Sequence, residues 1–600
     1  MGDVLYLILR RLRAPLITLI VVYAISVVGL TLAPGIDPQG QPWRMGFFHA
    51  FYVMSYTATT IGFGEIPYAF TDAQRLWVTF SIYLSVIGWA YALGSVFALS
   101  QDPTFRAAAS RGLFVRRVAR LRQPYCVICG YGRSGRAIAL ALDALDVRIV
   151  IVEQDAQRAA PIEIEEFRAP PLVLVADARR PEVLREAGIA KPECRAVLAL
   201  TGDDEANQSI AIGTRVLDPA TMVIARVADP VVHDNLADFG GVHLINPFET
   251  FAANIGLDLV APEVLQLEEW LTGVPGSLRP ETLKLPQGHW VLAGYGRFGR
   301  AMAQMLRSAG QSWQAVDPNI APEDEGAEGV AIGKSAEQGL RECDIGRAVA
   351  LVAGTDSDSV NLATVTMARR LNPGIRIIVR QNKAYNRALI EAAGATVAFV
   401  QSDLMTHEVL QALTTPLLNR FLGQARRDGA GLARRALARL DEVFGKRVPW
   451  VWRFDCDPAQ PGMRHALSQA DGPLLLRELL VDPRDPQVPM LAVPLLLWRA
   501  PTAAASAHAA RGGAPLTDVF ASATSAGADE VVLPDPDTPL WAGDRILFAG
   551  GEGVEALQRR FLLDPSPIEL VRTGYEPPRS WLFRRFSSPT ARSAAARPRP

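Results

Sequence analysis

The stretch Thr60-Ile61-Gly62-Phe63-Gly64-Glu65 places two glycines one residue apart between apolar segments. Glycine adopts backbone angles that other residues avoid, so Gly62 and Gly64 allow successive carbonyl groups to point in one direction. Four copies of such a loop would stack rings of carbonyl oxygens, which can replace the water around a dehydrated cation. The hydroxyl of Thr60 can add a further ring at the inner end. These residues favour cation coordination by backbone oxygens.

The segments on either side of this loop are long enough to cross a membrane. Residues 15–33 and 76–99 contain no charged residue, and at about 1.5 Å per helical residue each spans a hydrocarbon core of roughly 30 Å. Residues 46–59 are apolar but too short to span. Irregular backbone at membrane depth is tolerated only where it lines a water-filled path or is buried in protein. The order of segments therefore predicts two spans enclosing a half-buried helix and a glycine loop.

This order resembles the pore of potassium channels, whose filter usually reads Thr-Val-Gly-Tyr-Gly-Asp. The resemblance implies that Thr60, Ile61, Gly62, Phe63 and Gly64 form a K⁺ selectivity filter, and that four chains assemble around it as a homotetramer. Phe63 replaces the usual tyrosine, so no phenolic hydroxyl is expected to brace the filter from behind, and Glu65 replaces the usual aspartate. A weakly selective cation channel is therefore the alternative. A simple turn in an apolar hairpin is disfavoured by the two flanking spans.

Two glycines, Gly88 and Gly94, interrupt the second apolar segment. Glycine inside a helix costs roughly 0.5–1 kcal/mol relative to alanine, so a glycine here needs a reason. Close packing against the first span is one reason, because small residues line helix contacts in membranes. A gating hinge is the other, and Gly88 is the candidate for it.

Basic residues lie outside the two spans. Arg10, Arg11 and Arg13 precede the first span and six arginines lie between residues 106 and 122, whereas the intervening loop has few. The positive-inside rule therefore places both termini in the cytoplasm. The resemblance to prokaryotic channels implies the inner membrane and contact with its lipid. A cleaved signal peptide is not expected, because the apolar run is long and no small-residue cleavage site follows it.

The composition narrows the remaining possibilities. Six hundred residues are too many for one core, and a net charge of −1 argues against a general nucleic-acid role. The five cysteines show no disulfide framework, which suits a reducing compartment. Cys126 and Cys129 form a C-x-x-C in an apolar run, where packing in a buried strand is favoured over metal or redox chemistry.

A glycine-rich motif occurs twice in the soluble part. Residues 125–136 (YCVICGYGRSGR) and 290–300 (WVLAGYGRFGR) each run an apolar strand into G-x-G-x-x-G and a helical pattern. A second strand then ends on Glu153 or Asp317, 23 residues beyond the first glycine (130 to 153 and 294 to 317). This is the βαβ fingerprint of dinucleotide-binding proteins. Its repetition predicts two tandem, Rossmann-like, doubly wound parallel sheets.

Each motif predicts a nucleotide site, because the glycines permit a tight turn and close approach of a phosphate to a helix N-terminus. A carboxylate after the second strand accepts ribose hydroxyls and repels a 2′-phosphate, so NAD or an adenine nucleotide (ADP or ATP) is favoured over NADP. After the third strand, an aspartate in the first repeat is matched by a lysine in the second, so the two sites are expected to differ. An empty scaffold used only for assembly is the alternative. The predicted nucleotide-binding residues are Gly130, Tyr131, Gly132, Arg133, Ser134, Gly135, Glu153 and Asp177 in the first repeat, and Gly294, Tyr295, Gly296, Arg297, Phe298, Gly299, Asp317 and Lys334 in the second.

A pore followed by two such repeats resembles the prokaryotic potassium channels gated by RCK domains (regulators of potassium conductance). The repeats also resemble the nucleotide-binding TrkA-N lobe of potassium-uptake regulators, whose G-x-G-R-x-G form is present twice. The resemblance implies a channel whose cytoplasmic domains bind a regulatory nucleotide. An oxidoreductase tethered to the membrane is the competing class. No catalytic acid–base set is found for it, so the chain is not expected to be an enzyme.

The expected fold class is a two-span α-helical pore domain joined to α/β domains and a small β-rich lobe. Two acidic runs, 203–205 and 323–325, raise the alternative of a divalent cation. A helix-start role is favoured for the first run and a solvated loop for the second, so no metal site is predicted. The expected domains are the pore (1–100), a linker (101–122), the first RCK domain with crossover helices (123–272), a linker (273–288), the second RCK domain (289–440), the β-rich lobe (441–570) and a disordered tail (571–600).

Overall fold

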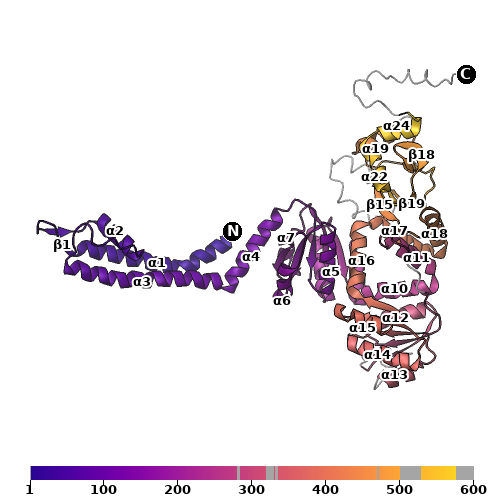
Figure 1. Ribbon diagram of the computed structural model, residues 1–600, viewed down its shortest axis with the longest axis horizontal. Coiled ribbons are helices and arrows are strands. Elements are labelled where there is room, and N and C mark those ends of the chain that lie inside the picture. The colour runs from indigo at the N-terminus through magenta and orange to yellow at the C-terminus, as the bar shows by residue number, and fades with distance from the viewer. Residues whose placement is uncertain are drawn as a thin grey trace, which may run out of the picture. The chain divides into compact units, whose positions relative to one another are not determined.

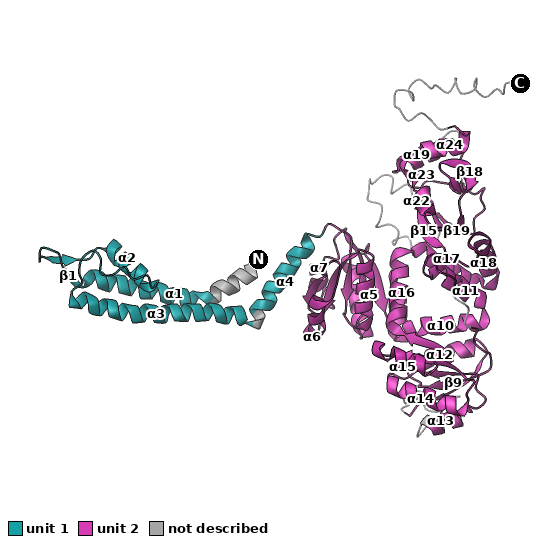
Figure 2. Ribbon diagram, viewed as in Figure 1, with its two compact units in different colours: residues 1–121 teal, residues 122–600 magenta. Residues whose placement is uncertain are grey.

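The computed structural model describes residues 2–279, 284–318, 330–331, 336–468, 472–499 and 529–575. Lys334, the acidic run 323–325 and the tail beyond residue 575 lie outside the described residues. The chain divides into two compact units, Met1–Leu121 and Arg122–Pro600 (Figure 2). Each unit has its own hydrophobic core.

The first unit is helical, with one short antiparallel strand pair, and two of its helical stretches, Leu12–Leu32 and Asp72–Gln101, are long and apolar enough to cross a membrane. Large apolar side chains on these stretches, including Ile20 and Leu76, are exposed, as expected of surfaces that face lipid or a neighbouring chain. The predicted spans and the short helix between them are therefore confirmed. The elements are α1 (Gly2–Leu32), β1 (Pro34–Ile36), β2 (Pro42–Arg44), α2 (Phe47–Ala58), α3 (Asp72–Gln101) and α4 (Pro103–Ala119).

Helices α1 and α3 approach closely at Gly29. A Cβ atom added there would lie 1.9 Å from the ring of Trp77, so no larger residue fits without a shift. The Trp77 indole N–H donates to the carbonyl of Ser26 at 2.9 Å, which fixes the contact. The sequence suggested that Gly88 of α3 allows the two spans to pack closely. The strictest requirement for a small residue at this contact instead lies at Gly29 of α1.

The second unit begins with a six-stranded parallel sheet in the order β5-β4-β3-β6-β7-β8. Cys126 and Cys129 are buried in β3, so the buried-strand interpretation of C-x-x-C is confirmed. The strands are β3 (Tyr125–Cys129), β4 (Arg148–Glu153), β5 (Leu172–Val175), β6 (Cys194–Ala199), β7 (Met222–Arg226) and β8 (Val242–Ile245). The helices are α5 (Arg133–Ala144), α6 (Ala156–Ala159), α7 (Pro181–Glu186), α8 (Asp204–Leu217) and α9 (Pro230–Phe239).

A second parallel sheet repeats this topology in the order β11-β10-β9-β12-β13-β14, which confirms the prediction of two doubly wound domains. In both sheets the strand order reverses beside the first strand, where such folds open a crevice for ligands. The strands are β9 (His289–Ala293), β10 (Ser312–Val316), β11 (Val330–Ala331), β12 (Ala350–Ala353), β13 (Arg376–Gln381) and β14 (Val397–Val400). The helices are α12 (Arg297–Ser308), α13 (Ala336–Glu342), α14 (Asp358–Leu371) and α15 (Arg387–Ala392).

The two α/β domains exchange helices. Helix α10 (Pro247–Val260) follows the first sheet but packs into the core of the second domain, beside α12. Helix α16 (Gln401–Thr414) follows the second sheet but packs into the core of the first domain, beside α5 (Figure 1). Each domain therefore has part of its core supplied by chain that follows the other.

A small antiparallel sheet, in the order β15-β22-β19-β20, forms the C-terminal lobe and confirms the predicted β-rich region. Its inner face shares a core with α11, α17 and α18. These elements are α11 (Pro262–Thr272), α17 (Pro416–Asp428), α18 (Ala430–Phe444), β15 (Trp450–Asp455), β19 (Ala492–Arg499), β20 (Asp529–Val532) and β22 (Arg545–Gly550). The smaller elements are α19 (Pro461–Ser468), the pair β16 (Leu474–Leu475) and β21 (Pro539–Leu540), the pair β17 (Val481–Asp482) and β18 (Asp485–Pro489), α22 (Val554–Gln558), α23 (Arg560–Leu563) and α24 (Ser566–Thr573).

Candidate functional site

The loop that follows α2 has the backbone expected of a filter. Gly62 and Gly64 have φ angles of +66° and +93°, in the region that favours glycine. A Cβ atom at either position would meet nothing within 4 Å of the described atoms, so backbone conformation rather than space requires glycine. Thr60 also has a positive φ of +62°, which the sequence did not predict.

A phenolic hydroxyl does brace this loop, so the expectation that it would lack one is wrong. The hydroxyl belongs to Tyr56 in α2, which donates to the carbonyl oxygen of Gly64. The ring of Phe63 packs against Tyr56 with 5.5 Å between centroids and stacks on Tyr52 at 6.3 Å. An aromatic cuff from α2 therefore supports Phe63. The one signal for it in the sequence is the spacing of Tyr52 and Tyr56, one helical turn apart.

The outer end of the loop is held by Glu65. Its carboxylate accepts from Arg75 Nε at 2.8 Å and from a second guanidinium nitrogen at 3.2 Å. It also accepts the Phe70 amide N–H at 2.8 Å. The residue that replaces the usual aspartate thus ties the loop to the start of α3. Both side chains of this ion pair are partly exposed, so its contribution to stability is modest.

Gly88 lies inside α3, which continues through it without a break. A Cβ atom added there would lie 3.6 Å from Val22 of α1, an ordinary van der Waals contact. This conformation therefore shows Gly88 at a helix contact, and its role as a hinge stays a prediction.

Backbone conformation and close packing within the protein require glycine at the first and third positions of both nucleotide motifs. Gly130 and Gly294 have φ angles of +99° and +103°. A Cβ atom on Gly135 would lie 2.1 Å from the carbonyl oxygen of Gly130, and one on Gly299 would lie 2.1 Å from that of Gly294. The turn and the close helix packing predicted for these glycines are therefore present in both repeats.

No described residue requires glycine at the middle positions, Gly132 and Gly296. Both have an ordinary φ of −76°, and a Cβ atom would meet nothing within 4 Å. They begin α5 and α12, and no side chain of the described residues caps either helix. No side chain that the structure describes therefore satisfies the first-turn N–H groups of either helix, an arrangement that suits a phosphate group.

The two predicted ribose acceptors lie beside these glycines. Glu153 accepts the Tyr131 amide N–H at 2.5 Å and the Asp155 amide N–H at 2.9 Å, and it is 5% exposed. Asp317 accepts the Tyr295 amide N–H at 2.7 Å and is half-buried. Both acids thus brace their own loops, a role that the sequence did not predict. A carboxylate has about four acceptor positions, so Glu153, which accepts two amide N–H groups, retains capacity for ribose hydroxyls.

Asp177 follows β5 at the same edge of the first sheet. Its carboxylate is held by Arg179, whose Nε and terminal nitrogen donate at 3.0 and 2.8 Å. These hydrogen bonds keep the pKa of Asp177 below its usual value. The guanidinium of Arg179 therefore offsets much of the negative charge that was expected at Asp177.

Two arginines lie at the carboxyl ends of corresponding strands and were not among the predicted residues: Arg226 is the last residue of β7, and the partly buried Arg380 is the next-to-last residue of β13. Arg226 is 9% exposed and donates to the carbonyl of Thr201 at 2.9 Å. Burial lowers the pKa of both arginines, and the nearby charges of Arg133 and Arg297 lower it further. Two glycine-loop arginines and two strand-end arginines therefore gather where the two domains face each other. The sequence signal was an arginine closing the same apolar strand in both repeats.

Three carboxylates act against this cationic cluster: the charge of Asp204 acts on Arg226, and those of Asp356 and Asp358 act on Arg380. Arg297 lies 3.8 Å from the buried carboxylate of Asp204, which also accepts the amide N–H groups of Ala228 and Asp229. The neighbouring Asp203 caps α8 by accepting from Glu205 and Ala206, so the helix-start role favoured for this acidic run is confirmed.

Comparison with known proteins places these features in families. Residues 17–101 match the ion-channel family, and residues 126–247 and 290–401 each match the TrkA-N domain. Potassium channel protein 1 of Methanocaldococcus jannaschii is 25% identical over 259 residues, which are 43% of this chain and 73% of that protein. The Trk system potassium uptake protein TrkA homolog of Pyrococcus abyssi is 37% identical over 106 residues, which are 18% of this chain and 44% of that protein.

Among solved structures, the GsuK channel bound to NAD is 17% identical to this chain, with a TM-score of 0.45 over 93% of this chain and 99% of that one. The family matches indicate a channel rather than an enzyme. The nucleotide motifs fall within the two TrkA-N matches and the glycine loop falls within the ion-channel match. The chain therefore belongs to the potassium channels in which a two-helix membrane pore is followed by tandem TrkA-N (RCK) domains.

Proposed function

We propose that four copies of this chain form a potassium-selective pore. The observation that carries this is the loop after α2, where Gly62 and Gly64 adopt left-handed backbone angles between two helices able to cross a membrane. One chain supplies one loop, and a cage of carbonyl rings needs several. The bond from Tyr56 to the Gly64 carbonyl and the packing of Phe63 support a fixed filter despite its non-standard residues.

The basic residues around the spans support an inner-membrane protein with both termini in the cytoplasm. The TrkA-N domains then lie on the cytoplasmic side, where nucleotides are abundant. Lipid contacts the exposed apolar faces of α1 and α3.

Reversal potentials of the purified protein in planar bilayers, with K⁺ on one side and Na⁺ on the other, test the selectivity. The wild type should strongly favour K⁺. Tyr56→Phe should reduce that preference, because it removes the hydroxyl that holds the Gly64 carbonyl. Tyr52→Phe is the matched control, since Tyr52 contacts Phe63 through its ring. Equal K⁺ and Na⁺ permeability in the wild type would instead establish the weakly selective cation channel.

We propose that each TrkA-N domain binds NAD or an adenine nucleotide such as ADP or ATP, and that binding shifts the open–closed equilibrium of the pore. The middle glycines support this, because the described residues leave open the space that a phosphate would occupy beside each uncapped helix. A nucleotide would supply phosphate charge there and a ribose for Glu153 or Asp317.

The arginines between the domains give a physical route from binding to gating. Phosphate at either glycine loop would neutralise part of the cluster formed by Arg133, Arg226, Arg297 and Arg380, and so change the interaction of the two domains. Moving a gate from 1:99 to 99:1 takes about 5.5 kcal/mol of differential binding, or about 0.7 kcal/mol for each of eight sites in a tetramer. Weak coupling at each site is therefore enough.

Mass spectrometry of nucleotide released from the purified full-length protein, followed by calorimetric titration, tests this proposal. We expect adenine nucleotide or NAD to bind and to change open probability in single-channel recordings. Failure of NAD, ADP and ATP alike to bind the wild type would overturn it.

A further inference from the structure

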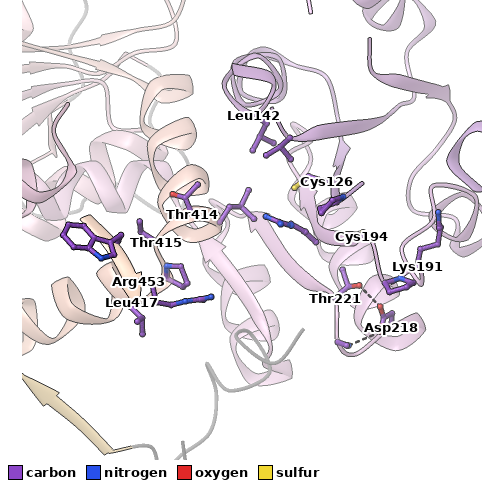
Figure 3. Close-up of a pocket in the computed structure, with 18 of the residues that line it drawn as sticks. Cys126, Leu142, Lys191, Cys194, Asp218, Thr221, Thr414, Thr415, Leu417 and Arg453 are labelled. Carbon is purple, nitrogen blue, oxygen red and sulfur yellow. Dashed lines mark hydrogen bonds between the residues drawn. The ribbon is translucent and has the colours of Figure 1, made fainter. Parts of the chain in front are cut away.

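A cavity of about 560 Å³ lies at the amino ends of β3 and β6, on the edge of the first sheet opposite the glycine loop. Three parts of the second unit line it: the first α/β domain, the bend between α16 and α17, and strands β15 and β22 of the C-terminal lobe (Figure 3). Protein interiors leave few voids larger than a water molecule, whereas ligand sites measure about 300–1,000 Å³ and favour domain junctions. The size and place of the cavity are those of a ligand site.

The walls are mainly apolar and come from all three parts. Leu142 of α5, Leu417 of α17 and Leu547 of β22 contribute aliphatic surface. Cys126 adds a thiol whose pKa burial raises to about 12, so it stays neutral and behaves as a small apolar group. Such walls favour a hydrocarbon body, because burying it removes apolar surface from water.

Among the described residues that line the cavity, the one acid is already engaged. Asp218 accepts the hydroxyl of Thr221 at 2.6 Å and the amide N–H of Ala220 at 3.1 Å (Figure 3). The Thr221 hydroxyl also contacts the carbonyl of Ile189 at 3.0 Å. Asp218 therefore serves the turn between α8 and β7, and it offers little to a cationic ligand.

The basic residues that line the cavity differ in whether an acidic side chain pairs with them. Arg453 pairs with Asp455 at 2.8 Å and Lys191 lies 3.6 Å from Glu193. The guanidinium of Arg195 forms no hydrogen bond or ion pair with any residue that the structure describes, yet its charge acts on the thiol of Cys126 in the cavity wall. The cavity thus presents an unmatched guanidinium beside an apolar chamber.

We propose that this cavity binds an amphipathic carboxylate, with its hydrocarbon chain among the leucines and its carboxylate on Arg195. A guanidinium matches a carboxylate with two parallel hydrogen bonds, which makes this pairing specific. The bound chain would contact the first α/β domain, the α16–α17 bend and the C-terminal lobe at once, and so link them. This site lies on the opposite sheet edge from the proposed nucleotide site and does not depend on it.

Photoaffinity labelling of the full-length protein in lipid nanodiscs tests the proposal. The probe is dodecanoate that carries a diazirine near the end of its chain, and the adducts are located by peptide mass spectrometry. We expect adducts in residues 413–417 and 451–453, suppressed by excess unmodified dodecanoate. The corresponding dodecanamide probe should label these peptides about tenfold less, because it lacks the charge that Arg195 recognises.

Arg195→Gln should reduce acid labelling about tenfold, whereas Arg185→Gln, an exposed arginine of α7 outside the cavity lining, should leave it unchanged. Leu417→Trp should abolish labelling by filling the chamber. Arg195 is exposed, so its variant tests the proposal even if Leu417→Trp fails to fold. Equal labelling by acid and amide, unchanged labelling in Arg195→Gln, or adducts confined to other peptides would each overturn the proposal.

Discussion

The two glycine loops share a backbone but differ in what covers them. In the first loop, the hydroxyl of Tyr131 and the guanidinium of Arg136 both donate to Glu165, which follows β4. Tyr131 and Glu153 are each 5% exposed. A polar network made from Tyr131, Arg136 and Glu165 therefore holds the tyrosine of the first site, and Tyr131 and Glu153 are buried although the space beside Gly132 stays open.

The second loop is arranged differently. Tyr295 stacks on Trp313 of β10, with 6.0 Å between ring centroids and 14° between planes, and Arg307 lies 5.7 Å over the same Trp313 ring. Gly296 is exposed and Asp317 is half-buried. Two nearly identical motifs thus support two differently accessible sites, because residues outside the motif decide how each tyrosine is held. We expect the second site to bind nucleotide more readily.

The largest effects should come from adding one methyl group to the glycines. Gly135→Ala and Gly299→Ala would each place Cβ 2.1 Å from a backbone carbonyl, so each should destabilise its domain by roughly 1–3 kcal/mol or more and abolish binding there. Gly132→Ala and Gly296→Ala are matched controls that meet no described atom. They should keep the melting temperature yet lose nucleotide affinity. Calorimetry measures both quantities, and normal affinity in the controls would mean that no phosphate approaches the middle glycine.

The next largest effects concern the acids. Glu153→Ala and Asp317→Ala should each weaken binding at their own site by about 1.5–3 kcal/mol, through loss of charge-assisted hydrogen bonds to ribose. Glu153→Ala should also lower the melting temperature more, because it leaves the Tyr131 and Asp155 amides without their acceptor in a buried site. Titration calorimetry and thermal unfolding separate the two effects. Unchanged affinity in both variants would assign the acids to loop bracing alone.

Much of this architecture could be predicted from local sequence pattern. The spans follow from runs of apolar residues, and the filter backbone follows from Gly62 and Gly64, because a requirement for positive φ is visible in one residue type. The two α/β domains follow from the repeated glycine spacing and the acid 23 residues beyond each first glycine. Each of these signals is carried by residues close together in the chain.

The features that could not be predicted depend on tertiary placement. The hydrogen bond from Tyr56 to Gly64 joins a helix to a loop eight residues later. Comparison of Phe63 with the usual filter tyrosine predicted that no hydroxyl would brace the loop. The gathering of Arg226 with Arg297 needs two domains to face each other. The exchange of α10 and α16 between domains has no local signature, because both helices show only an amphipathic pattern; crossover helices before residue 272 are expected from the family resemblance alone.

A smaller effect should follow from opening the first site. Glu165→Gln weakens the acceptor that holds Tyr131 and Arg136, so affinity at the first site should rise about threefold and approach that of the second site. Glu166→Gln is the matched control one residue along, at an exposed position. Nucleotide titration of each variant in a Gly296→Ala background isolates the first site. A fall in affinity for Glu165→Gln would show that the network organises the site instead of closing it.

The smallest effect concerns the residue after the third strand, where Asp177 in the first repeat corresponds to Lys334 in the second. Asp177 holds Arg179 through two guanidinium contacts, so Asp177→Ala should release a cation at the carboxyl edge of the first sheet. The freed charge resembles what Lys334 supplies by sequence in the second repeat, so the first site should shift toward the more highly phosphorylated ligand. We expect the ratio of ATP to ADP affinity there to rise two- to threefold, about 0.5 kcal/mol, because the guanidinium is partly exposed and screened. Lys334→Ala should lower the same ratio at the second site. Binding isotherms for NAD, ADP and ATP measure both shifts. Identical profiles for the wild type and both variants would show that the third-strand residues do not distinguish the two repeats, and the contrast would then lie entirely in how Tyr131 and Tyr295 are held.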